Sequence, residues 1–315
     1  MLPNTDELAE VLLDLAVPHQ DIDEAVRLSR HITNDPETLR TLDKAVTDLV
    51  QDMGRIRGTT LDIPALPDAS TATARFFPLF VFVAALPHIR AHHRERGIPD
   101  DVSRHTLADV GRCVAWHRRW HGTGGLLIPQ WLTLHFHGEL YQLGRLQFQR
   151  SRIGGRTGAS IAAAGLPQAP GDPGLAVHVP DFMGPLTPQA IERSLTLALA
   201  FFARHYPEET YSVATCASWL LGPQLKRRLP KDSNIVRFQE RFHPARRSAD
   251  PEAPEAPEAP EVPEVPEDME PVRFVFGTTD VPLDQLPRRT VLERAVLDHL
   301  REGGHWHVGR GWLKL

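Results

Sequence analysis

The stretch LAVHVPDFMGPLTPQAIERSLTLALAFFARHY, residues 175–206, decides the expected fold, because it contains a strand, a short loop and a long helix in succession. Its first residues alternate β-forming side chains with smaller or polar ones, and Pro180 ends the strand because it has no N–H for a ladder. Thr187 and Pro188 are typical of a helix start, and the apolar residues after them recur at helical spacing.

A strand that leads into a helix through a short loop leaves unpaired backbone N–H groups at that loop. It also places the positive end of the helix dipole there. Such a loop suits a phosphate or a diphosphate. The alternative is a plain β-turn-α unit that binds nothing, and this stretch alone does not exclude it.

The composition is that of a globular protein with one large or two ordinary domains. The chain has 315 residues, of which 41% are hydrophobic, and a formal net charge of −5. Residues 250–270 hold nine acids and no Lys or Arg, so the rest of the chain carries +4. This mild positive charge suits an anionic ligand and is too small to indicate a nucleic-acid-binding protein.

No stretch of the sequence is typical of a secreted or membrane protein. The acidic N-terminus lacks a signal-peptide pattern. The most apolar run, residues 76–87, is shorter than a membrane span and contains Pro78. The two cysteines, Cys113 and Cys216, are too few for a disulfide framework or a zinc ribbon. We therefore expect a cytoplasmic protein that binds neither nucleic acid nor membrane.

The first part of the chain is expected to be helical. Residues 5–54 predict three helices, the third of which opens at Pro36 behind Asp35. A loop over residues 59–73 precedes an apolar segment, which we predict as a buried helix kinked or interrupted at Pro87, with a strand over residues 79–83 as the alternative. Another helix is expected over residues 104–121, ending at Gly122.

The pattern changes at residue 126, where two alternating runs around His137-Gly138-Glu139 predict a β-hairpin. A loop over residues 154–174 leads into the stretch described first. The later expected elements are a strand at 210–221, a helix from Gly222, a disordered acidic Pro/Glu linker at 249–271, a strand at 272–277, a helix at 284–302 and a last strand. The linker interrupts one domain and does not separate two.

This order of elements resembles the GNAT acyltransferase fold. The resemblance is sharper in five stretches: LGRLQFQ at 143–149, VHVP followed by PLTP within 177–188, CASWLL at 216–221, SNIVRFQ at 233–239 and VFG at 275–277. They are similar to the GNAT-like C-terminal domain of a bacterial acyltransferase family, in which it follows a helical N-acyltransferase N-terminal domain. The resemblance implies an α+β protein with a helical domain over residues 1–125 and a GNAT-like domain over residues 126–315.

The resemblance also implies acyl transfer from acyl-coenzyme A, as co-substrate, to an unknown amine. In GNAT enzymes the strand that corresponds to 175–180 pairs with the pantetheine arm, and the next loop binds the pyrophosphate. The cofactor-binding candidates are therefore Val179, Gly184, Leu186 and Thr187. The usual Gln/Arg-x-x-Gly-x-Gly/Ala pattern is absent, and three prolines remove donors from this loop.

His178, Cys216 and Ser218 are the catalytic candidates, because the resemblance places them on the walls of the gap that holds the thioester. His178 suits a general base, Cys216 an acid or nucleophile, and Ser218 a donor to the leaving sulfur. Each has a structural alternative, namely a hydrogen-bonded sheet histidine, a buried small hydrophobe and a strand-end hydroxyl. For Arg145 the sequence leaves open an anion contact or a structural hydrogen bond.

Sixteen histidines include pairs at spacings that can bind metal, such as His117 and His121. None has a third ligand at a signature spacing, so no metal is expected. The sequence therefore favours an acyl-CoA-dependent N-acyltransferase. The alternative is a GNAT-like module that has lost catalysis and binds a partner or ligand, which the proline-rich loop favours. An open loop with free N–H groups would distinguish the enzyme from the module.

Overall fold

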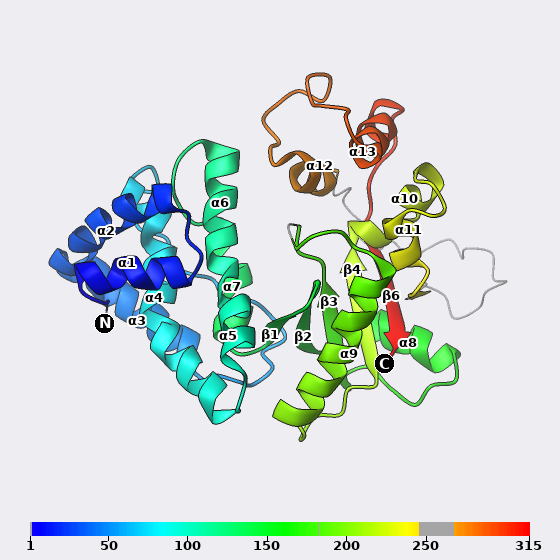
Figure 1. Cartoon of the computed structure of the whole chain (residues 1–315), viewed down its shortest axis with the longest axis horizontal. Coiled ribbons are helices and arrows are strands. Elements are labelled where there is room, and N and C mark those ends of the chain that lie inside the picture. The colour runs from blue at the N-terminus through cyan, green and yellow to red at the C-terminus, as the bar shows by residue number, and fades with distance from the viewer. Residues whose placement is uncertain (1, 182, 246–267) are drawn as a thin grey trace. The chain divides into compact units, whose positions relative to one another are not determined.

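A computed structural model describes residues 2–181, 183–245 and 268–315. The chain is an α+β protein with two compact units, Met1–Gln142 and Leu143–Leu315 (Figure 1). The division falls after residue 142, later than the expected boundary at residue 125, because one further helix belongs to the first unit. Most of the expected acidic linker at 249–271 lies outside the described residues.

The first unit is helical. Its helices are α1 (Thr5–Asp14), α2 (His19–Asn34), α3 (Pro36–Val50), α4 (Ala72–Glu95), α5 (Asp100–Leu107), α6 (Asp109–His121) and α7 (Pro129–Phe136). The three expected helices are confirmed as α1 to α3, and the Asp35 carboxylate caps α3 by accepting from the Glu37 and Thr38 N–H groups. The single helix expected over residues 104–121 is two helices, α5 and α6, and Gly122 ends α6 with φ +70°.

Helix α4 lies at the centre of the helical unit, in contact with α2, α3 and α7. It continues through Pro78 and Pro87, so the expected interruption and the alternative strand at 79–83 are both wrong. Its apolar residues face all directions because neighbours surround it, as in a core helix. The sequence analysis gave an apolar run of residues 76–87, too short to span a membrane. Helix α4 is longer, with 24 residues, and by length and hydropathy it could span one. Most of its apolar part is buried inside the unit.

The second unit contains most of a mixed sheet in the order β1-β2-β3-β4-β6-β5, of which β1 crosses the division at residue 142. Figure 1 labels all of these strands except β5. Its strands are β1 (Leu140–Leu143), β2 (Leu146–Arg152), β3 (Pro173–His178), β4 (Val213–Ser218), β5 (His243–Pro244) and β6 (Gly309–Lys314). Its helices are α8 (Gly155–Ala163), α9 (Pro188–His205), η1 (Trp219–Leu221), α10 (Pro223–Arg228), α11 (Asn234–Gln239), α12 (Met269–Phe276) and α13 (Val291–Arg301). The expected strand–loop–helix is confirmed as β3, residues 179–187 and α9.

Three expected elements differ in the second half of the chain. The expected hairpin around Gly138 is wrong, because its first half is α7, which begins at Pro129; the tight turn lies at Gly144, with φ +69°. The Ala-rich loop at 154–174 contains α8, in line with the high helix propensity of Ala. The expected strand at 272–277 is α12, which ends at Gly277 in the left-handed conformation.

The two faces of the sheet are covered by different helices. On one face Trp312 of β6 donates its indole N–H to Ser160 of α8 over 3.0 Å. On the other face Arg150 of β2 stacks on Tyr206, the residue that follows α9. Side chains of neighbouring strands that share a register position point to the same face, so each site residue can be assigned to the α8 face or to the α9 face.

Candidate functional site

Strands β3 and β4 stop pairing with each other before either strand ends. They run parallel, and their register covers only Leu175 with Ala214 and Ala176 with Thr215. On its other side β3 still pairs with β2 as far as His178, and β4 still pairs with β6 as far as Ser218. The sheet is therefore open between the C-terminal ends of β3 and β4, at the point where ligands bind in open sheets.

The opening brings His178 and Ser218 to its two sides, but on opposite faces of the sheet. His178 lies two residues after Ala176 and shares the α8 face with Thr215. Cys216 and Ser218 alternate with Thr215 and so belong to the α9 face. The structure therefore does not pair His178 with Cys216 as a base and a nucleophile.

His178 is half-buried and is held by a cross-strand contact from β2. Its Nε2 lies 3.0 Å from Oε1 of Gln149, a distance that suits the tautomer in which Nε2 carries the hydrogen and this oxygen accepts it. In the neutral ring the lone pair is then on Nδ1, the nitrogen suited to take a proton. The sequence analysis did not link Gln149 to His178. Alternating polar side chains on two paired strands are the signal that identifies this contact.

Cys216 and Ser218 have different environments. The Cys216 side chain is 4% exposed, and burial raises the pKa of its thiol to about 12, so it is protonated at neutral pH. Ser218 caps η1, since its Oγ accepts from the Leu220 N–H over 3.1 Å. Its own hydrogen donates to no group among the described residues. Ser218 thus keeps a donor at the opening, whereas Cys216 is a buried thiol.

The loop from Val179 to Thr187 follows β3 and retains unused donors. In the described part of the chain, the N–H groups of Gly184, Leu186 and Thr187 donate to no acceptor. Gly184 has φ +81°, and a Cβ placed there would meet no atom within 4 Å, so the space beside it is open. Thr187 caps α9 by accepting from the Ala190 N–H over 3.2 Å. Val179 is partly buried against the cluster around Trp219.

Arg145 lies at the turn between β1 and β2, and its side chain contacts this loop. Its Nε donates to the Gly184 carbonyl over 2.7 Å and its Nη1 to the Pro180 carbonyl over 2.8 Å. Burial lowers the pKa of Arg145, and the charge of Asp181 opposes that shift. Of the two roles left open by the sequence, the structure shows hydrogen bonds to the backbone. The sequence did not indicate Ser194, whose Oγ accepts from the Arg145 N–H over 2.8 Å.

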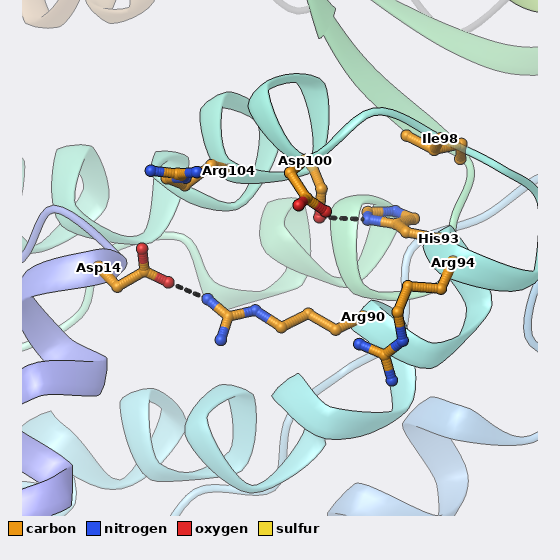
Figure 2. A pocket seen from close by; sticks show the side chains of 8 residues that line it. Asp14, Arg90, His93, Arg94, Ile98, Asp100 and Arg104 are labelled. Carbon is orange, nitrogen blue, oxygen red and sulfur yellow. Dashed lines mark hydrogen bonds and ion pairs between the residues drawn. The ribbon is translucent and has the colours of Figure 1, made fainter.

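The helical unit contains a separate polar pocket of about 250 Å³, shown in Figure 2. Arginines and acids line it, and Arg90 forms an ion pair with Asp14. His93 lies in its wall, with Nδ1 2.7 Å from Oγ of Ser103. Burial, together with the charges of His92 and Arg90, lowers the pKa of His93 to about 3, so the ring is neutral at physiological pH and is a weak base. None of the site residues expected from the sequence lies in this pocket.

The histidine pairs do not form metal centres within the part of the chain that the structure describes. No group of three or more His, Cys, Asp or Glu side chains there is arranged to hold a metal ion. The rings of His117 and His121 lie 4.8 Å apart, and Nδ1 of His117 lies 2.8 Å from the carbonyl oxygen of Thr123. His135 instead faces a carboxylate oxygen of Asp109 at 3.2 Å.

Comparison with known proteins gives two matching domain families and several similar solved structures. The family model described as an N-acyltransferase N-terminal domain matches residues 6–138, and that described as a GNAT-like C-terminal domain matches residues 140–313. None of the curated proteins matches the chain.

The similar structures cover the whole of this chain. An acyltransferase in complex with decanoyl-CoA and teicoplanin has a TM-score of 0.85 and 39% identity, with 100% of this chain and 90% of that chain covered. An acyltransferase mutant in complex with octanoyl-CoA has the same TM-score, identity and coverage. An acyltransferase in complex with CoA and 10C-teicoplanin has a TM-score of 0.84 and 38% identity, again with 100% and 90% covered.

Proposed function

Because the chain belongs to the acyltransferase family that joins an N-acyltransferase N-terminal domain to a GNAT-like C-terminal domain, we propose that the β3–β4 opening is its active site. The protein is an acyl-CoA-dependent acyltransferase, and its acceptor is an amine. One observation carries the location of the site: β3 and β4 separate beside a loop that has N–H groups without acceptors among the described residues.

The reaction forms one C–N bond and breaks one C–S bond. The amine nitrogen attacks the thioester carbonyl to give a tetrahedral oxyanion, which collapses as the coenzyme A thiolate leaves. The amine loses one proton and the thiolate gains one, so the products are an amide and free coenzyme A. Alignment of the two substrates and removal of the amine proton are the steps that the protein has to assist.

His178 is proposed as the general base, acting through Nδ1 while Gln149 holds Nε2. Ser218 is proposed to donate its hydroxyl hydrogen to the leaving sulfur, either directly or through a water. Cys216 is the weakest of the three candidates, because its thiol is buried and burial raises its pKa to about 12. The site thus needs no covalent intermediate on the protein.

The donor is proposed to lie along the end of β3. Val179 would contact the pantetheine arm, and Gly184, Leu186 and Thr187 would direct their backbone N–H groups to the diphosphate at the start of α9. The unused donors of this loop favour the enzyme over the alternative of an inactive binding module, although three prolines reduce the number of donors.

Two finer features of the reaction belong to this proposal. The donor chain is proposed to be of the length of octanoyl or decanoyl, because relatives at 39% identity bind those thioesters. The acceptor is proposed to be an amine-bearing compound of the kind that teicoplanin represents for those relatives. We propose a cytoplasmic location, in agreement with the free thiols of Cys113 and Cys216.

The test measures coenzyme A release with octanoyl-CoA or decanoyl-CoA as donor and teicoplanin as acceptor. Wild-type protein should release coenzyme A in an acceptor-dependent way. Because loss of a general base typically costs about 10²–10⁴ in rate, His178→Gln should lower kcat by that factor and flatten the pH profile.

His243 provides a matched control in the same sheet. It is exposed on the edge strand β5, where its ring stacks on Trp312 with the ring centroids 4.4 Å apart. His243→Gln should therefore keep full activity. Equal activity of wild type and His178→Gln would refute the role of the base, and no acceptor-dependent release from any donor would refute the function.

A further inference from the structure

We propose that Arg145 is a positioning residue, which shapes the loop at 179–187 so that this loop can bind the diphosphate of the acyl donor. The inference rests on the proposed function and adds to it a residue that need not touch the thioester. It begins with a buried arginine whose donors are directed at backbone oxygens and not at a carboxylate.

The guanidinium of Arg145 connects the two ends of a short turn. Arg145 as a whole is 9% exposed, and its guanidinium donates to the carbonyls of Pro180 and Gly184, four residues apart. A planar guanidinium holds two acceptors in a fixed geometry, which the ammonium group of a lysine does not. Arg145 therefore fixes the distance between these two carbonyls, which lie on either side of the first part of the loop.

This arrangement also fixes the direction of one N–H group of the loop, that of Asp181. In a trans peptide the C=O and N–H bonds point in opposite directions. The Pro180 carbonyl points toward Arg145, so the N–H of Asp181 in the same trans peptide unit points away from it. The Gly184 carbonyl belongs to a peptide unit that has no N–H, because the next residue is Pro185. Arg145 thus binds carbonyls without consuming any of the loop's donors.

The arginine is itself held in place by α9. The hydroxyl of Ser194 accepts from the Arg145 N–H over 2.8 Å and from the Leu146 N–H over 3.3 Å, and it donates to the Ala190 carbonyl over 2.9 Å. A Cβ at Gly144 would lie 2.7 Å from the same hydroxyl, so the turn can approach α9 closely only with glycine there. The loop and the helix that follows it are therefore joined through one turn.

The charge of Arg145 also suits an anion above the loop. Among the described residues it forms no ion pair within 4.0 Å, and its hydrogen-bond acceptors are neutral carbonyls. A guanidinium stays charged even when buried. Its positive charge adds to that of the unpaired N–H groups at the start of α9, although Asp181 opposes it.

The test compares two donors, one with and one without the nucleotide part that carries the diphosphate. One donor is octanoyl-CoA, and the other is octanoyl-pantetheine, which has the same thioester but no nucleotide diphosphate. Steady-state kinetics would be measured for wild type, Arg145→Met and Arg145→Lys, the last in case the methionine variant does not fold. Arg152→Met serves as the control, because Arg152 is the last residue of β2, the strand that follows Arg145, and donates to the carbonyl of Gly171 in a different loop.

The expected result is a KM for octanoyl-CoA at least about tenfold higher in the Arg145 variants, with kcat nearly unchanged. The kinetics with octanoyl-pantetheine should match those of wild type, and Arg152→Met should match wild type with both donors. Equal losses with both donors, or no loss with either, would overturn the inference. A wild-type protein that uses neither donor would overturn the proposed function, and the inference with it.

Discussion

Replacing Arg150 by Met tests the buried ion pair between Arg150 of β2 and Glu209. Arg150 donates to both oxygens of Glu209, over 2.8 and 2.6 Å, and its guanidinium lies 3.9 Å from the ring centre of Tyr206. The Arg150 side chain is 2% exposed and that of Glu209 is 18% exposed. Met fills a similar volume without a charge, so Arg150→Met removes the pair and leaves Glu209 behind.

The expected cost follows from what Glu209 retains. Removing one partner of a buried pair costs about 3–5 kcal/mol. Glu209 keeps a hydrogen bond from the hydroxyl of Tyr211 and some contact with water, which places the cost at the lower end, about 3 kcal/mol. At about 2–4 °C per kcal/mol for a domain of this size, the Tm of the second unit should fall by about 6–12 °C.

The same variant has a predictable pH dependence. Burial raises the pKa of Glu209, but the hydrogen bonds from Arg150 and Tyr211 outweigh burial, so its pKa lies below the ordinary value. A lowered folded-state pKa contributes stability above the ordinary value of about 4.3, and this contribution is lost as the pH falls toward the folded-state pKa. The gap in unfolding free energy between wild type and Arg150→Met should thus be largest near neutral pH and shrink in acid.

Thermal and urea unfolding of the full chain at a series of pH values measures this gap. Lys44→Met is the control, because the Lys44 side chain in the Lys44–Asp48 pair is 76% exposed and its loss should cost less than about 0.5 kcal/mol. Glu209→Gln combined with Arg150→Met should recover part of the loss, since no unpaired charge remains. A loss below about 1 kcal/mol, or one that does not change between neutral and acidic pH, would refute the reasoning.

Two further predictions concern a candidate site residue and a helix contact. Cys216→Ala should leave kcat almost unchanged and lower stability by about 1 kcal/mol, because the thiol is buried and protonated; a kcat reduced as much as in His178→Gln would show that the thiol takes part. Gly111→Ala should cost about 2–3 kcal/mol in thermal unfolding, because its Cβ would lie 2.0 Å from the Ala16 carbonyl oxygen. Gly155→Ala should be neutral or stabilising by up to about 1 kcal/mol, since a Cβ there meets no atom within 4 Å; equal effects of the two glycine variants would contradict this account.

Sequence reasoning succeeded where the signal is local. Asp35 before Pro36 and Thr187 before Pro188 are cap and first-turn pairs, and both helices begin there. It failed for short apolar runs, because α7 and α12 have eight residues each, too few to distinguish a period of 2 from one of 3.6. In α4 the prolines favoured an interruption of the helix. The helix nevertheless continues through Pro78 and Pro87, because packing against α2, α3 and α7 outweighs the low helix propensity of proline.

For the site, the sequence and its family resemblance identified the strand, the loop, the helix and the side chains with suitable chemistry. These depend on neighbours within a few residues, which a sequence displays directly. The assignment of His178 and Cys216 to opposite faces depends on the register between β3 and β4, and these strands are separated by a whole helix. The contacts of Arg145 with Pro180 and Gly184 also join distant residues. Only the tertiary structure decides such contacts, because packing and hydrogen bonds between remote segments select one register among several that local preference allows.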